Sequence, residues 1–388
     1  MEYIKIKEIN EYVAKSINPM KTPDEVFEMY SVPTYDTGHP EYLRGDEIAS
    51  NKMIVRKNDV LLCKINPRIN RVWVVQDESE YKNIASSEWI VVRNSYYNPE
   101  FLAWYFRNPQ FKKLMTSEVT GIGGSLTRAQ PKAVAEYPVP VIKRQEQDKI
   151  VEVLNMIAGV IKSRQQELEK MDELIKARFV EMFGDPIQNP KGWDTPLIEN
   201  VVANEKNALK AGPFGSALKK EYYVESGYKI YGQEQVISGD HTIGNYYIDK
   251  ERYKALENCA VQAGDVLISL VGTYGKLLII PDEFEPGIIN PRLMKITFDK
   301  NKVNPLYFKF FFQSESLKRA LSENTHGGTM DILNLGMVKK ISMPLPPLKL
   351  QNKFVSFVEQ VNKSKVAVQK ALDETQLLFD SLMQKYFG

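Results

Sequence analysis

Residues 57–62 have the sequence KNDVLL, and residues 263–268 have the sequence AGDVLI, so an acidic residue followed by three apolar ones recurs after 206 positions. Residues 98–102 (NPEFL) recur at the same offset as residues 304–308 (NPLYF). Further matches follow in the same order: FKK at 111–113 with LKR at 317–319, PVP at 138–140 with PLP at 344–346, GG at 123–124 with 327–328, and FG at 183–184 with 387–388. Matches that keep their order at a nearly constant offset predict an internal duplication.

The repeat length sets the domain organisation. A period near 205 residues is far longer than the roughly 20–50 residues of a solenoid repeat. It fits two complete domains in a chain of 388 residues, each followed by a similar element. We expect a first domain over residues 1–143, a helix over 144–185, a second domain over 186–349 and a second helix over 350–388.

Each of the two helical segments carries one apolar stripe. Residues 145–183 contain no proline, and their apolar residues recur at alternating intervals of three and four, as on one face of a helix. The expected seam comprises Ile150, Leu154, Ile157, Ile161, Leu168 and Ile175 in the first helix, and Phe354, Val358, Val361, Val368, Leu372 and Phe379 in the second. Stripes longer than four heptads are typical of coiled coils.

Two arrangements of these helices are open. Each could pack on its own domain as a single amphipathic helix. We favour pairing of the two helices with each other, because both exceed what one small domain would cover and both have the same frame. Repeat symmetry then predicts an intramolecular, antiparallel coiled coil.

The regions before the helices look β-rich. Residues 59–65, 71–75, 265–271 and 277–280 are apolar or β-branched runs typical of strands. Residues 98–106 and 304–312 are expected to be short helices, since Asn followed by Pro suits an N-cap and first helical position. The predicted fold class is therefore α+β, with two β-rich domains, two long helices and a pseudo-twofold repeat.

The composition excludes several classes of protein. Two cysteines are too few for a disulfide framework, and the three histidines lie far apart in sequence. No apolar run of about 18 residues and no signal peptide is apparent, so we expect a soluble cytoplasmic protein. The balance of 51 basic against 49 acidic residues lacks the basic excess of many nucleic-acid-binding domains.

Any anionic ligand must therefore meet local clusters. Candidates are residues 64–71 (KINPRINR) in the first half, and Lys219, Lys220, Lys276 and Arg292 in the second. Arg and Asn can pair with guanine and adenine edges, and Lys suits phosphate. Each cluster could equally be a solvated loop. The Gly-rich segments 120–127 and 325–329 could approach a ligand closely or be simple turns.

Catalytic motifs are missing. Asn-Pro is never followed by the second Pro that an amino-methyltransferase loop needs, and neither a dinucleotide fingerprint nor a GxxxxGK[ST] loop occurs. No cluster of carboxylates with a lysine suggests a metal nuclease. The sequence therefore favours a binding protein over an enzyme.

Four segments carry a resemblance to a known family: residues 344–348 (PLPPL) leading to Gln351, residues 212–218 (GPFGSAL), residues 264–269 (GDVLIS), and residues 59–68 (DVLLCKINPR). Together they resemble the specificity (S) subunit of type I restriction–modification systems, over essentially the whole chain. The first half departs from the pattern, because it lacks a GPFGS segment and has PVPVI in place of PLPPL.

The resemblance implies two target-recognition domains, each reading half of a bipartite DNA site, held apart by the helix pair. It also implies two modification (M) subunits that bind S-adenosylmethionine and methylate adenine N6, and restriction (R) subunits that use ATP and Mg. This chain itself would bind no cofactor and no metal. The candidate DNA-contacting residues are Lys64, Asn66, Arg68, Asn70, Arg71, Ser216, Lys219, Lys220, Tyr274, Lys276, Arg292 and Thr329.

Two other functions stay open at this stage. A fused methyltransferase–endonuclease would bind S-adenosylmethionine by itself. A coiled-coil scaffold would bind proteins and never contact DNA.

Overall fold

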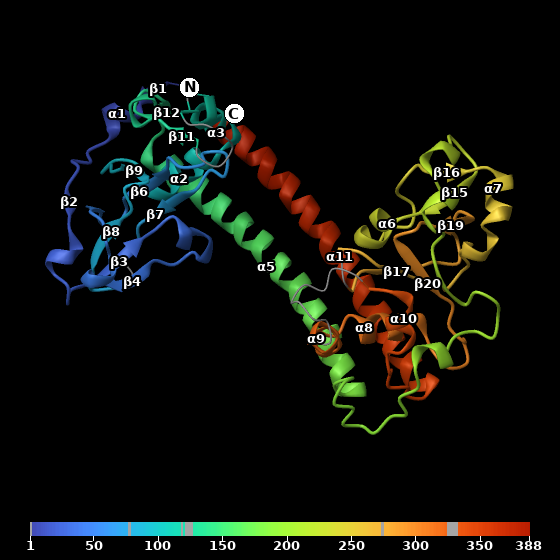
Figure 1. Ribbon diagram of the computed structural model, residues 1–388. Helices are drawn as coiled ribbons and strands as arrows, with labels where there is room; N and C mark the ends of the chain where they lie inside the picture. Colours follow the sequence, from blue (N-terminus) through green and yellow to red (C-terminus); the bar gives the residue numbers. More distant parts are fainter. Residues whose placement is uncertain (1, 77–78, 118, 121–126, 273–274, 324–332) are drawn as a thin grey trace. The chain divides into compact units, whose positions relative to one another are not determined.

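The computed structural model describes residues 2–76, 79–117, 119–120, 127–272, 275–323 and 333–388. The chain forms two compact units. Unit 1 comprises Met1–Gln165 together with Lys370–Gly388, and unit 2 comprises Gln166–Gln369. The two long helices, α5 (Arg144–Phe183) and α11 (Leu348–Phe387), therefore contribute residues to both units, and both chain ends belong to unit 1 (Figure 1).

Unit 1 is built around a three-stranded antiparallel sheet of order β7–β6–β9. Its central strand is β6 (Val60–Cys63), flanked by β7 (Val72–Val74) and β9 (Trp89–Val92). Successive side chains of a strand point to opposite faces. Val60 and Leu62 enter a core with helix α2 (Pro99–Arg107), whereas Leu61 and Cys63 enter a second core with Tyr30. Both faces of this sheet are covered, which explains its continuous apolar sequence.

A five-stranded sheet of order β2–β5–β8–β3–β4 completes the β structure around the second core. Its strands are β2 (Ser16–Ile17), β5 (Lys52–Ile54), β8 (Lys82–Ala85), β3 (Val26–Tyr30) and β4 (Glu41–Arg44), with β3 and β8 parallel. The smaller elements of unit 1 are β1 (Tyr3–Lys5), α1 (Ile6–Ile9), α3 (Pro109–Ser117), β10 (Val119–Thr120), β11 (Arg128–Ala129), α4 (Pro131–Val134) and β12 (Pro138–Pro140). The PVP segment at residues 138–140 forms β12, which pairs antiparallel with β1.

Unit 2 contains two four-stranded sheets. The first has the order β13–β20–β17–β18, with strands β13 (Leu209–Ala211), β20 (Leu293–Ile296), β17 (Val266–Ser269) and β18 (Leu277–Ile279). The second has the order β14–β16–β15–β19, with strands β14 (Tyr223–Val224), β16 (Tyr247–Ile248), β15 (Tyr228–Tyr231) and β19 (Gly287–Ile289). The helices are α6 (Gln233–Ser238), α7 (Lys250–Ala255), α8 (Pro305–Phe312), α9 (Glu315–Glu323) and α10 (Leu335–Lys339).

The recurring acidic residue of the opening motif has a structural role in each unit. The buried Asp59 carboxylate accepts two hydrogen bonds of 2.7 Å from Arg93 and one of 2.9 Å from the Arg56 backbone N–H. The buried Asp265 carboxylate pairs with Lys295 at 3.2 Å and accepts from the Gln262 backbone N–H at 3.0 Å. Burial raises the pKa of Asp265, and Lys295 opposes that rise. The motif thus fixes the start of a central strand.

The mixed helix and sheet fold predicted from the sequence is confirmed. The expected strands correspond to β6, β7, β17 and β18. Asn98 caps α2 by accepting from the Glu100 backbone N–H at 2.9 Å, and Asn304 caps α8 by accepting from the Leu306 backbone N–H at 3.0 Å.

Candidate nucleic-acid interface

The basic cluster of unit 1 forms the turn between β6 and β7. Asn66 and Asn70 have φ values of 52° and 57°, a left-handed conformation that asparagine adopts more readily than most residues. The Asn66 backbone N–H donates to Thr127 O at 2.9 Å, and the Lys64 backbone N–H donates to Glu88 O at 3.0 Å. The turn is therefore held against two neighbouring segments. Lys64 is half-buried and Arg68 is exposed.

Polar atoms at the base of this turn lack partners. Buried atoms without a hydrogen-bond partner among the described residues include Asn70 Oδ1, Arg71 Nε and Glu88 Oε2. The other carboxylate oxygen of Glu88 pairs with Arg128 at 3.2 Å. Buried polar groups are normally satisfied, so unpaired ones call for a water or a ligand. One donor and two acceptors of this kind match the edges of bases.

The turn between β17 and β18 in unit 2 has the same backbone pattern. The Leu270 backbone N–H donates to Arg292 O at 2.9 Å, as the Lys64 N–H donates to Glu88 O. The Leu333 backbone N–H donates to Leu270 O at 2.9 Å, as the Ala129 N–H donates to Lys64 O at 2.8 Å. In each unit, the hairpin turn is therefore hydrogen-bonded on two sides. One partner directly precedes the strand that pairs with the hairpin (β9 or β20), and the other lies further along the chain.

The side chains on this frame differ between the units. In unit 2, Arg292 Nη1 donates to Gln233 Oε1 at 3.2 Å, and Gln233 Nε2 donates to Ser269 Oγ at 2.8 Å and to Val271 O at 2.7 Å. Arg292 and Val271 are exposed. A guanidinium and a carboxamide therefore lie together at this turn, and Arg292 stands where unit 1 has Glu88. Arg can bind guanine and Gln can bind adenine, each through two hydrogen bonds.

The other candidate residues of unit 2 are more dispersed. Ser216, Lys219 and Lys220 are exposed on the segment that follows β13, and Lys219 pairs with Glu221 at 3.4 Å. Lys276 is exposed at the start of β18. Burial lowers the pKa of Lys309, and the nearby Lys276 lowers it further. Tyr274 and Thr329 lie outside the described residues, as do residues 121–126 of the first Gly-rich segment and all of the second.

The sequence analysis missed several polar residues on these faces. Glu88, Arg128 and Gln233 are brought to the hairpin turns by pairing between distant segments, and no local motif marks them. Arg107 was also missed. Its guanidinium donates to Val72 O at 2.7 Å and lies 5.0 Å from the centre of the Trp104 ring. A search of the sequence for basic clusters finds only residues that are neighbours along the chain.

A basic cavity of about 430 Å³ lies beside the unit 1 turn. Its lining residues are Tyr35, Asp36, Thr37, Gly38, Val72, Trp73, Arg107 and Lys162. Two cations against one carboxylate leave a net positive lining, which suits a phosphate group. The cavity shares Val72 with the strand that follows the turn, so backbone binding and base reading could occur on one face.

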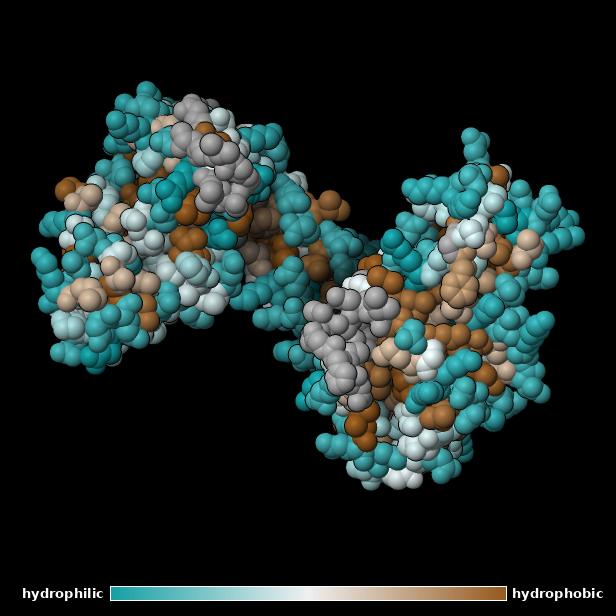
Figure 2. Space-filling model, viewed as in Figure 1, coloured by the Kyte–Doolittle hydropathy of each residue, from teal (hydrophilic) through white to brown (hydrophobic). Residues whose placement is uncertain are grey.

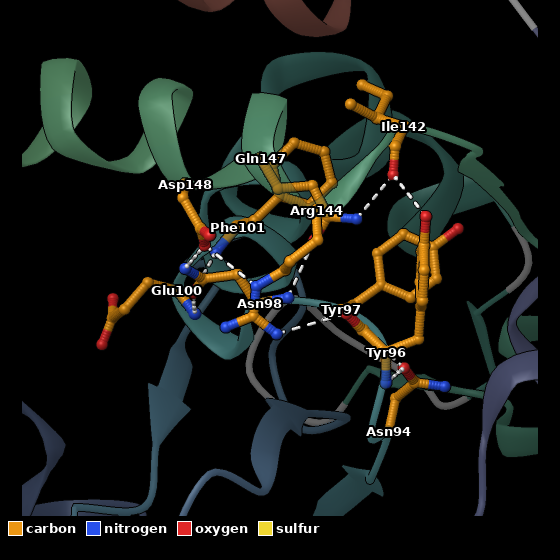
Figure 3. Close-up of polar contacts among 10 residues, drawn as sticks. All are labelled: Asn94, Tyr96, Tyr97, Asn98, Glu100, Phe101, Ile142, Arg144, Gln147 and Asp148. Atoms are coloured by element: carbon orange, nitrogen blue, oxygen red, sulfur yellow. Dashed lines mark hydrogen bonds and ion pairs between the residues drawn. The ribbon is translucent and has the colours of Figure 1, made fainter.

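A buried glutamine joins helix α5 to the capped helix α2 in unit 1 (Figure 3). Gln147 Oε1 accepts from the Asn98 backbone N–H at 2.8 Å, and Gln147 Nε2 donates to Ile142 O at 2.7 Å. Asp148 accepts from Asn98 Nδ2 at 2.7 Å and from Arg144 Nε at 2.9 Å. These bonds fix the start of the long helix against the core of the unit.

Unit 2 repeats this joint. Gln351 Oε1 accepts from the Asn304 backbone N–H at 2.9 Å, and Gln351 Nε2 donates to Pro346 O at 2.8 Å and Lys302 O at 2.9 Å. Asn352 replaces the carboxylate and accepts from Asn304 Nδ2 at 3.0 Å. Both glutamine side chains are fully buried. The joint therefore positions α11 as its counterpart positions α5.

Segments of the two long helices contact each other within each unit. All the predicted seam residues are buried or half-buried. In unit 1, the half-buried Arg164 donates to Ala371 O and Thr375 Oγ1, while Leu154 shares a core with Phe387. In unit 2, Lys365 Nζ lies 2.6 Å from Asp172 Oδ1. As residue numbers rise along α5, those of its contacts on α11 fall, so the paired segments are antiparallel.

Aromatic residues at the C-terminal ends of α5 and α11 pack against aromatic residues of the units. Phe387 of α11 lies 5.6 Å from Phe101 in unit 1, and Phe183 of α5 lies 4.9 Å from Tyr307 in unit 2, both edge-on. The helix that starts in one unit thus ends against the capped helix of the other unit's core. The corresponding residues are 204 positions apart for Phe183 and Phe387, and 206 apart for Phe101 and Tyr307.

Hydrophilic residues cover most of the surface seen in Figure 2, with apolar residues in smaller patches. Among the described residues, no group of three or more His, Cys, Asp or Glu side chains could hold a metal ion. Within the same described ranges, no helix is long and apolar enough to cross a membrane. Burial raises the pKa of both cysteine thiols, Cys63 and Cys259, which disfavours the reactive thiolate.

Residues 206–375 match the family model for the type I restriction modification DNA specificity domain. The chain is also 20% identical over 402 residues to the type I restriction enzyme MjaVIII specificity subunit of Methanocaldococcus jannaschii, an alignment that covers 95% of this chain and 89% of the relative. The chain is similar to the type I specificity subunits.

The chain is also similar to the type I restriction enzyme EcoBI specificity subunit of Escherichia coli, with 19% identity over 77% of this chain and 67% of the relative. A solved chain from work on complex assembly and conformational transition of the type I R-M system matches with a TM-score of 0.64 and 18% identity, covering 100% of this chain and 97% of the other. The type I S subunit from M. genitalium gives a TM-score of 0.53 at 13% identity, covering 100% and 96%. These structures share the fold.

Proposed function

We propose that each unit of this specificity subunit reads one half of a bipartite DNA site through the face built on its hairpin turn. The observation that carries the proposal is the shared frame with different side chains. The Lys64 N–H to Glu88 O bond and the Leu270 N–H to Arg292 O bond define the same frame, on which unit 1 places Arg71, Glu88 and Arg128. Two related faces with different polar groups suit two different half-sites.

The chemistry of base recognition assigns roles to these groups. Arg71, Arg128 and Arg292 would bind guanine O6 and N7, Gln233 would bind adenine N6 and N7, and Glu88 would accept from cytosine N4. Lys64, Lys219, Lys220 and Lys276 would neutralise phosphates. Asn66, Arg68, Asn70 and Ser216 lie near these groups in sequence and complete the candidate faces. Tyr274 and Thr329 remain candidates from the resemblance.

We propose further that the two units arose by internal duplication and that α5 and α11 pair as one antiparallel coiled coil. The repeated glutamine joints and the antiparallel contacts within each unit support both ideas. A rigid helix pair would fix the unread spacer between the half-sites. The domain bounds of 1–143, 144–185, 186–349 and 350–388 stay part of this proposal.

The same proposal includes the partners of the chain. The chain would bind double-stranded DNA and recruit two M subunits, which bind S-adenosylmethionine, and R subunits, which use ATP and Mg. It would itself bind no cofactor and catalyse no reaction, and the complex would act in the cytoplasm. The mostly hydrophilic surface and the near-neutral charge of +2 fit a subunit whose partners contribute much of the phosphate binding.

Methylome mapping tests the proposal. A strain that expresses the cognate M subunit with this chain should carry methylated adenines in one two-part motif, and a strain with the M subunit alone should carry none there. Methylation without this chain, or a motif that is not bipartite, would contradict it.

Two other outcomes would redirect the assignment. Binding of S-adenosylmethionine by the purified chain alone, measured by calorimetry, would favour a fused methyltransferase–endonuclease. Absence of any DNA shift by the assembled complex at low salt would favour a protein scaffold.

A further inference from the structure

Phe214 is an apolar residue on an exposed loop, and its side chain is 90% exposed. It belongs to residues 212–216 (GPFGS), directly after β13. A single exposed apolar residue is common on a protein surface, but burial of a phenylalanine ring is usually favourable. The exposed ring does not contribute this stabilisation within the unit, so the way in which the surrounding loop holds it bears on its role.

The backbone holds Phe214 on a fixed platform. The Gly212 N–H donates to Leu293 O at 2.9 Å, which extends the pairing of β13 with β20. A Cβ atom at Gly212 would lie 1.9 Å from Asn290 O, so only glycine fits there. Pro213 is buried, and the Ala217 N–H donates to Phe214 O at 2.8 Å. The chain is therefore anchored on both sides of the exposed ring.

The platform lies beside the polar face of unit 2. Residues 212–213 run alongside the turn that carries Asn290 and Arg292, and Arg292 binds Gln233. The exposed residues that follow Phe214 are Ser216, Lys219 and Lys220. Cations and hydrogen-bonding side chains therefore follow Phe214 in sequence or lie on the neighbouring turn. A protein-binding aromatic residue would instead be expected at the centre of an apolar patch, whereas a cationic surround suits DNA.

We propose that Phe214 enters a groove of the DNA and makes an apolar contact with the base pairs of the half-site that unit 2 reads. This inference rests on the proposed function. Phenylalanine can pack against a thymine methyl in the major groove or against a base step in the minor groove. Hydrogen-bonding groups at Gln233 and Arg292 would read the neighbouring edges. Phe214 is thus assigned as a specificity-determining residue that acts through apolar contact, because its side chain has no hydrogen-bonding group.

The test uses the full chain assembled with its M subunit and a duplex carrying the motif of the wild-type complex. A second duplex has only the unit 2 half-site scrambled. Fluorescence anisotropy of F214A should show an affinity for the cognate duplex about tenfold weaker than wild type, with about twofold or less change on the scrambled duplex. Methylome mapping should show relaxed selectivity at a position in the unit 2 half-site only.

Three controls make the result decisive. F214L keeps an apolar side chain and should retain much of the cognate affinity. Y246A removes a ring that is 55% exposed and packs on Tyr223 in the same unit, and it should bind as wild type does. The thermal unfolding midpoint of F214A should equal that of wild type, because so exposed a ring contributes little to packing.

Unchanged discrimination and an unchanged motif in F214A would overturn the inference. Loss of the M subunit from purified F214A would also overturn it, because the ring would then contact protein. A wild-type complex with no preference for any bipartite duplex would contradict the proposed function itself.

Discussion

The backbone N–H of Asn98 donates to Gln147 Oε1 at 2.8 Å, which joins the N-cap of α2 to the first turns of α5. Unit 2 has the same relationship between Asn304 and Gln351, at 2.9 Å. Each glutamine also binds the extended chain before its helix, so one buried amide connects three segments. A buried glutamine side chain therefore helps to hold the start of each long helix against its unit.

Replacement of Gln147 by alanine should destabilise unit 1 by about 2 kcal/mol, because the Ile142 carbonyl and the Asn98 N–H would lose their partner. Gln145→Ala is the matched control, since Gln145 is exposed on the same helical turn. Urea unfolding followed by circular dichroism measures both. Equal stability of the two variants would show that the joint does not hold the helix.

Replacement of Lys365 by leucine should stabilise the helix pair and leave the recognised DNA sequence unchanged. The Lys365 side chain is 26% exposed at a seam position, and its partner Asp172 is 57% exposed. Such a pair contributes about 0–1 kcal/mol, whereas a leucine would bury apolar surface. We expect the thermal unfolding midpoint to rise by about 2 °C, and Lys363→Leu, at an exposed position, to give no rise. A lower midpoint would exclude Lys365 from the seam.

The buried Asp265 should make unit 2 less stable as the pH rises. Burial raises the pKa of this carboxyl in the folded state, so the folded state keeps a proton that the unfolded state has lost above about pH 4. Its contribution to stability is greatest near pH 4 and falls as the pH rises through the raised pKa. The stability advantage of wild type over Asp265→Asn should therefore shrink between pH 4 and pH 7.

Thermal unfolding midpoints at a series of pH values measure this trend. Asp282→Asn is the control, because Asp282 is exposed. Asp265→Asn also leaves Lys295 without its buried partner, so its midpoint should lie below that of wild type throughout. A difference between wild type and Asp265→Asn that grows with pH would contradict the assignment.

Replacement of Arg292 by alanine should weaken binding of the cognate duplex by about 1–3 kcal/mol and relax one position of the unit 2 half-site. Lys254→Ala removes an exposed cation on α7 and serves as the control. Anisotropy and methylome mapping report both effects. A uniform loss on cognate and scrambled DNA would instead assign Arg292 to a phosphate contact.

Local patterns in the sequence were enough to predict strands β6, β7, β17 and β18 and the capped helices α2 and α8. Asp59 and Asp265 indicate a central strand because each carboxylate accepts a hydrogen bond from the backbone of the turn before that strand. The Asn-Pro pairs indicate the start of a helix, because the side chains of Asn98 and Asn304 accept hydrogen bonds from backbone N–H groups in the first turn of α2 and α8. Such signals work because the interacting groups are neighbours along the chain.

Long-range pairing explains what the sequence analysis missed. Arg93 reaches Asp59 across 34 positions, and Gln233 reaches Val271 across 38. The register of the sheets creates these contacts, and composition does not encode them. The basic cluster at residues 64–71 was found because it is contiguous, whereas its partners Glu88 and Arg128 come from separate segments.

Domain exchange tests the central claim most directly. Residues 1–143 are replaced by the first domain of another type I specificity subunit of known motif, and methylated adenines are mapped in cells that also express the M subunit. The account predicts that one half of the two-part motif changes to that of the donor, while the other half and the spacer length stay the same. A change in both halves, or in neither, would contradict the assignment of one half-site to each unit.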